Sequence, residues 1–556
     1  MTGLWWKDKI VYQIYPKSFY DSNGDGIGDL RGIIEKLPYL SDLGVDILWI
    51  CPFYQSPMFD NGYDISDYYH VDPQFGTDED ALELIQAAEA RGIKIILDLV
   101  INHTSHEHEW FRKAWADPTG EYGQYYYIRE GKDGGPPTNW RSLFGGNAWE
   151  PIRDTGLYYL HVFGKEQPDL NWENPVVREK LYAMVNWWLD KGIAGFRVDA
   201  ITFIKKNLDF PMLEPDQPDG MALIQKASLN QPGIETFLTQ LKERTFKPHQ
   251  SLTVAEAPGV PFEDLPKYVG EDGFFSMIFD FSIADIDIRD DVWHVGSGWT
   301  VPDFRAAFYA LMAETQKTGW SANYLENHDQ PRSLNKYIPA QDIGYESATM
   351  LACLVLLARG TPYIYQGEEL GMTNCPMASI DDYNDLSTHD KYARALAAGL
   401  TEAEAMQAMF ARSRDHARTP FPWDDSKKAG FTTGQPWLKI NPNHTEINAK
   451  AQMNDASSIR AFYKKLIQLR KDPATRDCLV EGDFVPVETE DEHIIAFTRN
   501  WGQESILVAL NFQNQPATLA IDDRYDTIVL NNSAAIDRQP GQVTLVPYQA
   551  VVLRRA

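Results

Sequence analysis

Short apolar runs and longer amphipathic stretches alternate along most of the chain. The runs are rich in Val, Ile, Leu and aromatic residues, which predicts strands. The stretches between them, such as DALELIQAAEARG and VPDFRAAFYALMAETQKTG, repeat apolar residues three and four positions apart, which predicts helices. We expect strands at residues 10–16, 44–52, 93–103, 192–200, 251–257, 275–281, 320–329 and 361–369.

Eight such strand–helix units follow one another, and this repetition predicts how the strands are arranged. Strands that alternate with helices form parallel sheets, and eight units close into a (β/α)8 TIM barrel of the α/β class. We expect the barrel to comprise residues 1–103 and 174–475, with residues 457–470 as its closing helix.

Two segments depart from this alternation and are expected to form units of their own. Residues 104–173 are rich in Gly, Pro, Trp and Tyr and are too long for an ordinary loop, which predicts a small inserted domain (domain B) after the third strand. After residue 475 the helical periodicity stops, and runs such as HIIAFTRN and SILVALNF appear. Residues 476–556 therefore predict a C-terminal antiparallel β-sandwich.

Composition narrows the kinds of partner. The 556 residues carry a formal net charge of −28, which disfavours nucleic acid and anionic membrane surfaces and suits a neutral substrate. No apolar run is long enough to cross a membrane, no signal peptide is evident, and the four cysteines are scattered without metal-ligand spacing. We expect a cytoplasmic monomer without an organic cofactor.

Polar residues gather where the predicted strands end. The strand ends carry Asn102 and His103, Arg197 and Asp199, Glu256, and His328 and Asp329, and the loop after the second strand carries Asp60, Tyr63 and Asp64. In a TIM barrel the carboxyl ends of the strands share one mouth. We therefore expect these carboxylates, histidines and the arginine to face a common site.

This set of groups favours cleavage of glycosidic bonds, because the chain has carboxylates but no catalytic cysteine, nucleotide-binding glycine loop or metal cluster. One carboxylate has to attack the anomeric carbon as an anion while a second, protonated, donates to the leaving oxygen. Arg197 shares a strand face with Asp199 and is expected to keep Asp199 ionised. Glu256 lies in the apolar run SLTVAEA, where loss of solvent is expected to keep it protonated.

Four of these segments, DLVINHT, GFRVDA, VAEA and NHDQPR, resemble the signature regions of the α-amylase superfamily, glycoside hydrolase family thirteen. The resemblance runs from Trp5 to the C-terminus and is strongest to the oligo-1,6-glucosidase, dextran glucosidase and α-glucosidase group, through DNGYDISDY, YYLHVFGKEQPDLNWENP and RDHARTPFPWD. It implies a retaining, exo-acting α-glucosidase that removes the non-reducing-end glucosyl unit of short α-glucosides with α-1,4 or α-1,6 linkages, and leaves transglucosylation open.

The resemblance also implies roles for individual residues. Asp199 would be the nucleophile, Glu256 the general acid/base and Asp329 a stabiliser of the transition state. His103, Arg197 and His328 would bind the glucosyl unit, Asp60, Tyr63 and Arg414 would form the pocket floor, Phe163 and Gln167 its side, and Ala200 the aglycone wall.

The segment DSNGDGIGD has the spacing of an EF-hand loop. Asp21, Asn23, Asp25, the carbonyl of Ile27 and Asp29 take the first, third, fifth, seventh and ninth positions, but the bidentate glutamate of the twelfth is missing. A turn rich in Asp and Gly is the alternative. Because similar loops in the resembling group hold one structural metal ion, we expect structural Ca²⁺, with Mg²⁺ as the alternative ion.

Other functions on the same scaffold stay open. The alternatives are a sucrose isomerase, a trehalose-6-phosphate hydrolase and a non-catalytic binding barrel. The resembling isomerases carry an arginine-rich loop after the seventh strand, where this chain has SLNKYIPAQDIGYES, and the intact carboxylates disfavour a non-catalytic barrel. In the resembling group, valine after the nucleophile accompanies α-1,6 preference, so Ala200 favours α-1,4 or mixed specificity.

Overall fold

The computed structural model describes residues 4–288, 292–295, 298–534 and 536–555. At its centre lie eight parallel strands, one in each predicted segment: β1 (Val11–Ile14), β2 (Ile47–Ile50), β5 (Lys94–Val100), β10 (Gly195–Asp199), β12 (Leu252–Glu256), β13 (Met277–Phe279), β14 (Ala322–Asn323) and β15 (Thr361–Tyr365). They pair in the order β13-β12-β10-β5-β2-β1-β15-β14, and a parallel bridge between Ile278 and Ser321 joins the two ends. The predicted barrel is confirmed.

Side chains along the strands alternate between two apolar cores. Val11 and Ile47 belong to the core inside the barrel, where the ring of Trp49 also lies. Tyr12 and Leu48, one position along each strand, belong to the core between the strands and the helices. Both faces of the strands are therefore buried, which explains why they are continuous apolar runs in the sequence.

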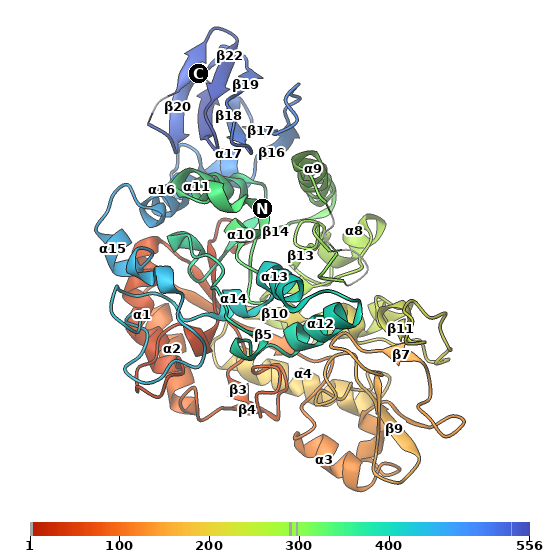
Figure 1. The fold of residues 1–556 in the computed structure, drawn as a ribbon. Helices are drawn as coiled ribbons and strands as arrows, with labels where there is room; N and C mark the ends of the chain where they lie inside the picture. The colour runs from red at the N-terminus through yellow and green to blue at the C-terminus, as the bar shows by residue number, and fades with distance from the viewer. Residues whose placement is uncertain (1–3, 289–291, 296–297, 535, 556) are drawn as a thin grey trace.

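Helices surround the strands (Figure 1). They include α1 (Leu30–Leu43), α2 (Asp78–Glu89), α4 (Pro175–Asp190), α6 (Ile234–Leu241), α9 (Val301–Thr318), α11 (Tyr345–Leu357) and the closing helix α16 (Ile459–Lys471). Local sequence decides where several of them begin. Thr77 and Asp80 form a capping box at α2, and Asn174 caps α4 ahead of Pro175 at its first position.

The segment between β5 and α4 has its own secondary structure. It contains α3 (Glu109–Ala116) and an antiparallel sheet of β6 (Ile128–Glu130), β9 (Leu157–Leu160) and β8 (Trp149–Pro151). Its strand β7 (Trp140–Arg141) pairs with β11 (Ala222–Leu223), which follows β10 in the chain. The inserted segment therefore pairs, through β7, with the chain that follows the fourth barrel strand.

The C-terminal part is the predicted antiparallel β-sandwich. One sheet contains β16 (Asp483–Pro486), β17 (Ile494–Trp501), β18 (Glu504–Asn511), β23 (Ala550–Arg555) and β20 (Tyr525–Asn531), and the other contains β19 (Ala517–Ala520), β22 (Gln542–Leu545) and β21 (Asp537–Gln539). Ile494 and Ala496 point into the core between the two sheets, whereas Ile495 and Phe497 join the core that they share with the barrel helices. The first sheet is therefore buried on both faces.

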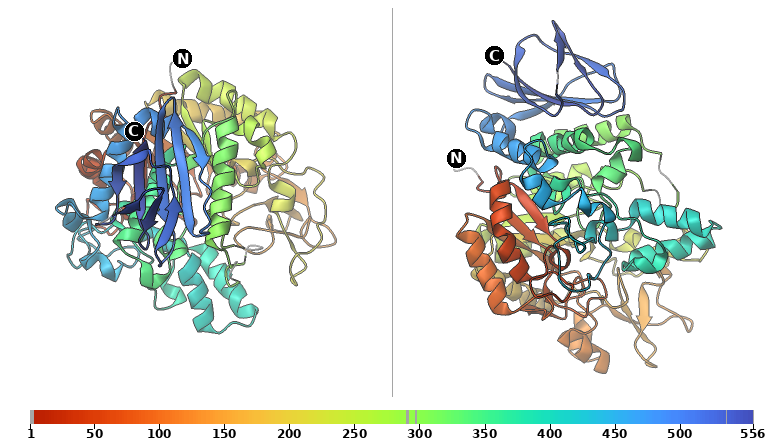
Figure 2. Two further views of the ribbon diagram at one scale, coloured as in Figure 1. Left: turned by 90° about the horizontal axis from the view of Figure 1, so that it is seen from above. Right: turned by 60° about the vertical axis from the view of Figure 1, so that its left-hand side comes forward.

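The sandwich and the inserted segment lie at opposite ends of the molecule (Figure 2). Between β15 and α16 the helices α12 (Leu386–Ala397) and α13 (Glu402–Arg412) pack against each other at the side of the barrel. Across the described residues, no helix combines the length and the apolar character needed to cross a membrane.

Candidate active site

The carboxyl ends of the barrel strands surround one pocket of about 210 Å³. Ten residues predicted from the sequence line it: Asp60, Tyr63, His103, Phe163, Gln167, Asp199, Ala200, Glu256, Asp329 and Arg414. The predicted Arg197 and His328 are buried and contact the lining carboxylates. The sequence did not point to seven further lining residues, Leu143, Phe144, Phe203, Gln225, Pro258, Phe281 and Asp285. Five of them come from loops, whereas Phe203 ends a short 3-10 helix (Ile201–Phe203) and Gln225 begins the short helix α5 (Gln225–Ser228). Loops and single helical turns carry no periodic pattern that reveals where a side chain lies.

Arg197 is the centre of a carboxylate cluster. Its Nη1 donates to Asp199 Oδ1 and to Asp98 Oδ1, each at 2.6 Å, and its Nη2 donates to Glu256 Oε2 at 2.7 Å. Asp98, which the sequence analysis missed, lies directly opposite Arg197 in the β5–β10 pairing. Asp98 is a charged residue within the buried, apolar part of the strand KIILDLV, and this feature could have identified it from the sequence.

The sequence predicted that Glu256 would be the carboxyl shielded from solvent, but Asp199 is the more buried of the two. The side chain of Asp199 is 10% exposed and that of Glu256 is 20% exposed, so the presumed proton donor is the one closer to solvent. Burial raises the pKa of Asp199, and the negative charges of Glu256 and Asp98 act in the same direction, while Arg197 lowers it. One guanidinium serves three carboxylates, so its charge is shared among Asp98, Asp199 and Glu256. Arg197 opposes protonation of Asp199 but does not overcome the effect of burial.

Asp329 stays an anion for a clear reason. Its Oδ1 accepts from Arg414 Nη1 at 3.0 Å and from Arg418 Nη2 at 2.8 Å, and its Oδ2 lies 3.0 Å from Nε2 of His328. Burial alone would raise the pKa of Asp329, but His328, Arg414 and Arg418 hold it well below its usual range. The ring of His328 is stacked on that of Tyr63 at 5.2 Å, which fixes the orientation of the imidazole.

Arg414 lines the pocket and binds three carboxylates. Besides Asp329 it donates to Asp60 Oδ1 at 3.2 Å, and its Nε donates to Asp385 Oδ1 at 3.0 Å. Asp385 precedes α12; burial opposes its ionisation, yet Arg414 and Arg418 lower its pKa to about 2. The predicted floor residue Arg414 is therefore held by three carboxylates from different parts of the chain.

His103, Phe163 and Gln167 line the pocket next to one another. Gln167 Nε2 donates to Asp60 Oδ2 at 3.1 Å, and the ring of Phe163 lies 5.3 Å from that of His103. Burial lowers the pKa of His103 to about 4, so its imidazole is neutral near pH 7. A neutral imidazole can both donate to and accept from a sugar hydroxyl.

Ala200 has an unusual backbone. It adopts φ 44° and ψ 34°, the left-handed region that residues with a Cβ rarely enter. Its N–H donates to Glu256 Oε2 at 3.0 Å, and its side chain lines the pocket. The residue after the predicted nucleophile thus orients the neighbouring carboxylate as well as forming part of the wall.

Residues 13–481 match the family model for the α-amylase catalytic domain. The chain belongs to the α-amylase family. It is a glycoside hydrolase. Residues 494–552, within the β-sandwich, match the model for the C-terminal domain of the α-amylase SusG.

Similar proteins within the α-amylase family match the whole chain. It is 42% identical to an oligo-1,6-glucosidase of Parageobacillus thermoglucosidasius, over 100% of this chain and 99% of that protein. It is 40% identical to a trehalose-6-phosphate hydrolase of Bacillus subtilis (strain 168), over 99% and 98%. The crystal structure of a trehalulose synthase from Pseudomonas mesoacidophila MX-45 superimposes with a TM-score of 0.94 at 39% identity, over 99% of both chains.

A buried cation ties the inserted segment of this α-amylase-family chain to the barrel. Lys206 Nζ lies 2.6 Å from Asp169 Oδ2, with neither side chain exposed, and donates to Asn102 Oδ1 at 3.1 Å. Asn102 follows the third barrel strand and Lys206 follows the fourth, whereas Asp169 lies in the inserted segment. No sequence pattern indicates this contact, because Lys205 and Lys206 are adjacent and only the fold distinguishes them.

The loop from Asp21 to Asp29 uses its polar side chains on its own backbone. Asp21 Oδ1 accepts from Gly24 N at 2.7 Å, Asn23 Oδ1 from Asp25 N at 2.9 Å and Asp25 Oδ1 from Ile27 N at 2.8 Å. Asp29 caps α1 through Gly32 N. Within the described ranges, no three His, Cys, Asp or Glu side chains are grouped so that they could hold a metal ion.

Proposed function

We propose that this protein is a retaining, exo-acting α-glucosidase that removes one glucosyl unit from the non-reducing end of short α-glucosides. The observation that carries the proposal is that Asp199 and Glu256 accept from the two terminal nitrogens of one guanidinium, in a pocket that Asp60 and Arg414 also line. Two carboxyls held this close suit the double displacement of retaining enzymes, in which they lie about 5–5.5 Å apart.

In the proposed mechanism the ionised form of Asp199, which Arg197 favours and burial opposes, attacks the anomeric carbon and forms a glycosyl ester. Glu256 gives its proton to the leaving oxygen, then takes a proton from the water that hydrolyses the ester. Its greater exposure suits this role, because its proton has to exchange with solvent in each cycle. Arg197 stabilises both anions without moving.

The other predicted residues bind the glucosyl unit in this proposal. Asp329 is kept anionic by Arg414, Arg418 and His328, and it can bind ring hydroxyls as positive charge develops at the anomeric carbon. Asp60 and Arg414 bind the terminal hydroxyls, which limits the pocket to one sugar. The neutral His103 contributes a hydrogen bond without adding a charge. No organic cofactor has a role in these steps.

The charge of the pocket favours a neutral aglycone over a phosphorylated one. Its lining carries five carboxylates (Asp60, Asp199, Glu256, Asp285 and Asp329) and one guanidinium, that of Arg414. Since Arg414 is already bound to three carboxylates, a phosphate would find like charges and no free cation there. Residues 333–347 contain a single basic residue, Lys336, so the arginine-rich loop expected of an isomerase is absent from that segment.

For linkage we propose that both α-1,4 and α-1,6 bonds are cleaved. The similar proteins include several oligo-1,6-glucosidases, which supports α-1,6 activity. Ala200 leaves more room at the aglycone wall than valine does, which supports α-1,4 activity as well. Initial rates on maltose and isomaltose measure the ratio.

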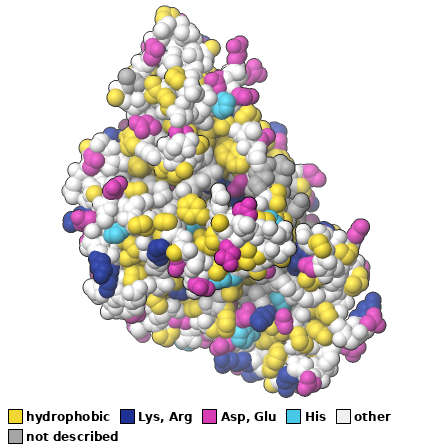
Figure 3. All heavy atoms as spheres, in the orientation of Figure 1, with side chains coloured by type: hydrophobic (Ala, Val, Ile, Leu, Met, Phe, Trp, Pro, Cys, Tyr) yellow, Lys and Arg dark blue, Asp and Glu magenta, His cyan; other side chains and the backbone are white. Residues whose placement is uncertain are grey.

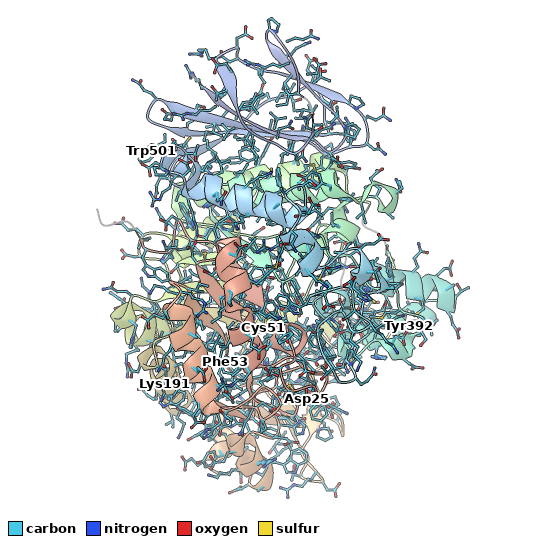
Figure 4. The ribbon with its side chains drawn as sticks, turned by 90° about the vertical axis from the view of Figure 1, so that its left-hand side faces the viewer. Asp25, Cys51, Phe53, Lys191, Tyr392 and Trp501 are labelled. Atoms are coloured by element: carbon cyan, nitrogen blue, oxygen red, sulfur yellow. The ribbon has the colours of Figure 1, made fainter. Side chains whose placement is uncertain are left out.

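We also propose that the loop of residues 21–29 binds a structural Ca²⁺. Three alternate side chains, those of Asp21, Asn23 and Asp25, accept from the backbone amide two or three residues ahead, which fixes the positions of oxygens that an ion of this class prefers. Asp25 is exposed (Figure 4) in the loop that leads into α1, and it does not line the active-site pocket, so the ion would stabilise the loop and take no part in the chemistry.

We propose domain boundaries at residues 103/104, 173/174 and 475/476, because the secondary structure changes character near these positions. A monomer in the cytoplasm remains a prediction from the sequence.

The product's anomeric configuration and one substitution test the proposal. ¹H NMR of the first sugar released from p-nitrophenyl α-glucoside should show α-glucose before mutarotation, and β-glucose would contradict a retaining mechanism. Asp199→Ala should lower kcat by several orders of magnitude with an unchanged circular dichroism spectrum. Asp209→Ala is the matched control, because Asp209 is exposed and does not line the pocket.

A further inference from the structure

We propose that the inserted segment carries a second carbohydrate-binding site, outside the active-site pocket, which takes a neutral oligosaccharide. A surface pocket of about 450 Å³ lies between α3, β9 and the loops that follow His103 and Phe163. Its volume is within the range of about 300–1,000 Å³ that is usual for small-molecule sites. In the lower part of Figure 3, where α3 and β9 lie, hydrophobic side chains are exposed between basic and acidic ones.

The wall of this pocket is aromatic and held in place. Phe111 and Trp115 lie four residues apart on one face of α3, and the ring of Tyr159 packs against them at 4.9 and 6.3 Å. The Tyr159 hydroxyl donates to the carbonyl of Lys165 at 2.6 Å. Phe111 is 2% and Tyr159 6% exposed, but Trp115 is 36% exposed. The two buried rings therefore support the indole of Trp115 as a fixed, solvent-facing surface.

The rim of the pocket is polar and balanced in charge. Arg112 Nη2 donates to Glu107 Oε2 at 3.0 Å. The side chains of Lys165 and Glu166, which line the same pocket, have no hydrogen-bond partner among the described residues. Two basic and two acidic groups give no net charge here, although the chain as a whole carries −28.

This combination selects the chemical class of the ligand. A sugar ring has a C–H face that packs on an indole and a rim of hydroxyls that both donate and accept hydrogen bonds. The ammonium of Lys165 can donate to sugar hydroxyls, the carboxylate of Glu166 can accept from them, and the aromatic wall can pack against the C–H face. A neutral ligand gains these contacts without a net Coulomb cost, whereas a charged one meets as much repulsion as attraction.

The second site cannot be filled by the glucosyl unit that reacts. His106 N donates to the carbonyl of Glu166 at 2.8 Å, and the next residue, Gln167, lines the active-site pocket. The backbone at Glu166 and Gln167 therefore separates the two pockets. That the natural ligand is an α-glucoside rests on the proposed function, but binding of a neutral sugar oligomer does not.

The test is an NMR titration of the Asp199→Ala protein with maltotriose and, separately, with isomaltotriose. The tryptophan indole ¹⁵N–¹H signal that disappears in Trp115→Phe identifies Trp115. We expect this signal to shift and saturate with its own Kd. Isothermal titration calorimetry measures the same second binding event without the indole signal, and Trp115→Ala should weaken it at least about tenfold, as loss of an aromatic anchor does. If the proposed glucosidase activity is incorrect but the second site exists, the Trp115 signal still shifts when the sugar is added.

Kinetics and a matched control complete the experiment. Trp115→Ala should leave kcat/KM on p-nitrophenyl α-glucoside unchanged, because this substrate has one sugar. Trp501→Ala is the control for loss of an exposed tryptophan, since Trp501 is 48% exposed on the C-terminal sandwich, far from α3 (Figure 4). A Trp115 signal that stays still while the sugars saturate the active site would overturn the proposal, as would equal effects of both alanine variants.

Discussion

Nη1 of Arg197 lies 2.6 Å from Oδ1 of Asp199, inside the mouth of the barrel, with the arginine side chain only 2% exposed. The same guanidinium also binds Glu256 and Asp98, so its charge is divided among three anions. This sharing explains why burial still raises the pKa of Asp199 although a cation touches it.

The first prediction concerns the charge of Arg197. Arg197→Gln should lower kcat on the order of 10²- to 10³-fold, as loss of a preorganised donor does. Arg197→Lys should be nearly as poor, because an ammonium cannot reproduce the fork that holds two carboxylates. Since Arg197 lowers the pKa of Asp199, its removal raises that pKa further. The acidic limb of the kcat/KM profile should therefore move to higher pH in Arg197→Gln. A limb at the wild-type position would show that Arg197 does not control the ionisation of Asp199.

The second prediction concerns the buried ion pair that anchors the inserted segment. Lys206→Met leaves Asp169 buried without its cation, which costs about 3–5 kcal/mol in comparable pairs. The Tm should fall by several degrees, and Lys206→Met combined with Asp169→Asn should recover part of the loss. Lys205→Met is the matched control, because Lys205 pairs with the partly exposed Glu173. Equal Tm values for the two single variants would refute the anchoring role.

The third prediction concerns linkage and Ala200. Valine adds two methyl groups at the aglycone wall and should move the maltose-to-isomaltose ratio of kcat/KM towards isomaltose by roughly ten- to two-hundredfold. The left-handed backbone at φ 44° adds a cost, because a β-branched residue is strained there. Ala200→Val should thus lower the Tm too, whereas Ala200→Gly should relieve the strain and favour maltose. A ratio that is the same in all three proteins would place linkage selection elsewhere in the pocket.

The fourth prediction concerns the loop of residues 21–29. A chelator should lower the Tm of the wild-type protein, because an ion that binds only the native state stabilises it. Asp21→Ala should lower the Tm and abolish the effect of the chelator. A chelator that leaves the wild-type Tm unchanged would assign the loop as a plain turn.

Much of the fold followed from the pattern of residues alone. Apolar runs separated by amphipathic stretches specify parallel strands and helices, because a strand buried on both faces has to be apolar throughout. The polar residues at the strand ends could be assigned to one mouth because parallel strands in a barrel all end on the same side. Asp199, Glu256 and Asp329 needed no coordinates to be placed together.

Other features depended on contacts between distant parts of the chain. The position of Asp98 beside Arg197 is set by the register of β5 against β10, which no local pattern encodes. The pairing of Lys206 with Asp169 and the outer wall of the pocket come from loops whose paths only the packed molecule determines. The balance between Asp199 and Glu256 is also a tertiary property, because burial and neighbouring charge depend on every element packed around a group. Sequence determined which chemical groups meet at the mouth of the barrel, and tertiary structure decided how they share one guanidinium.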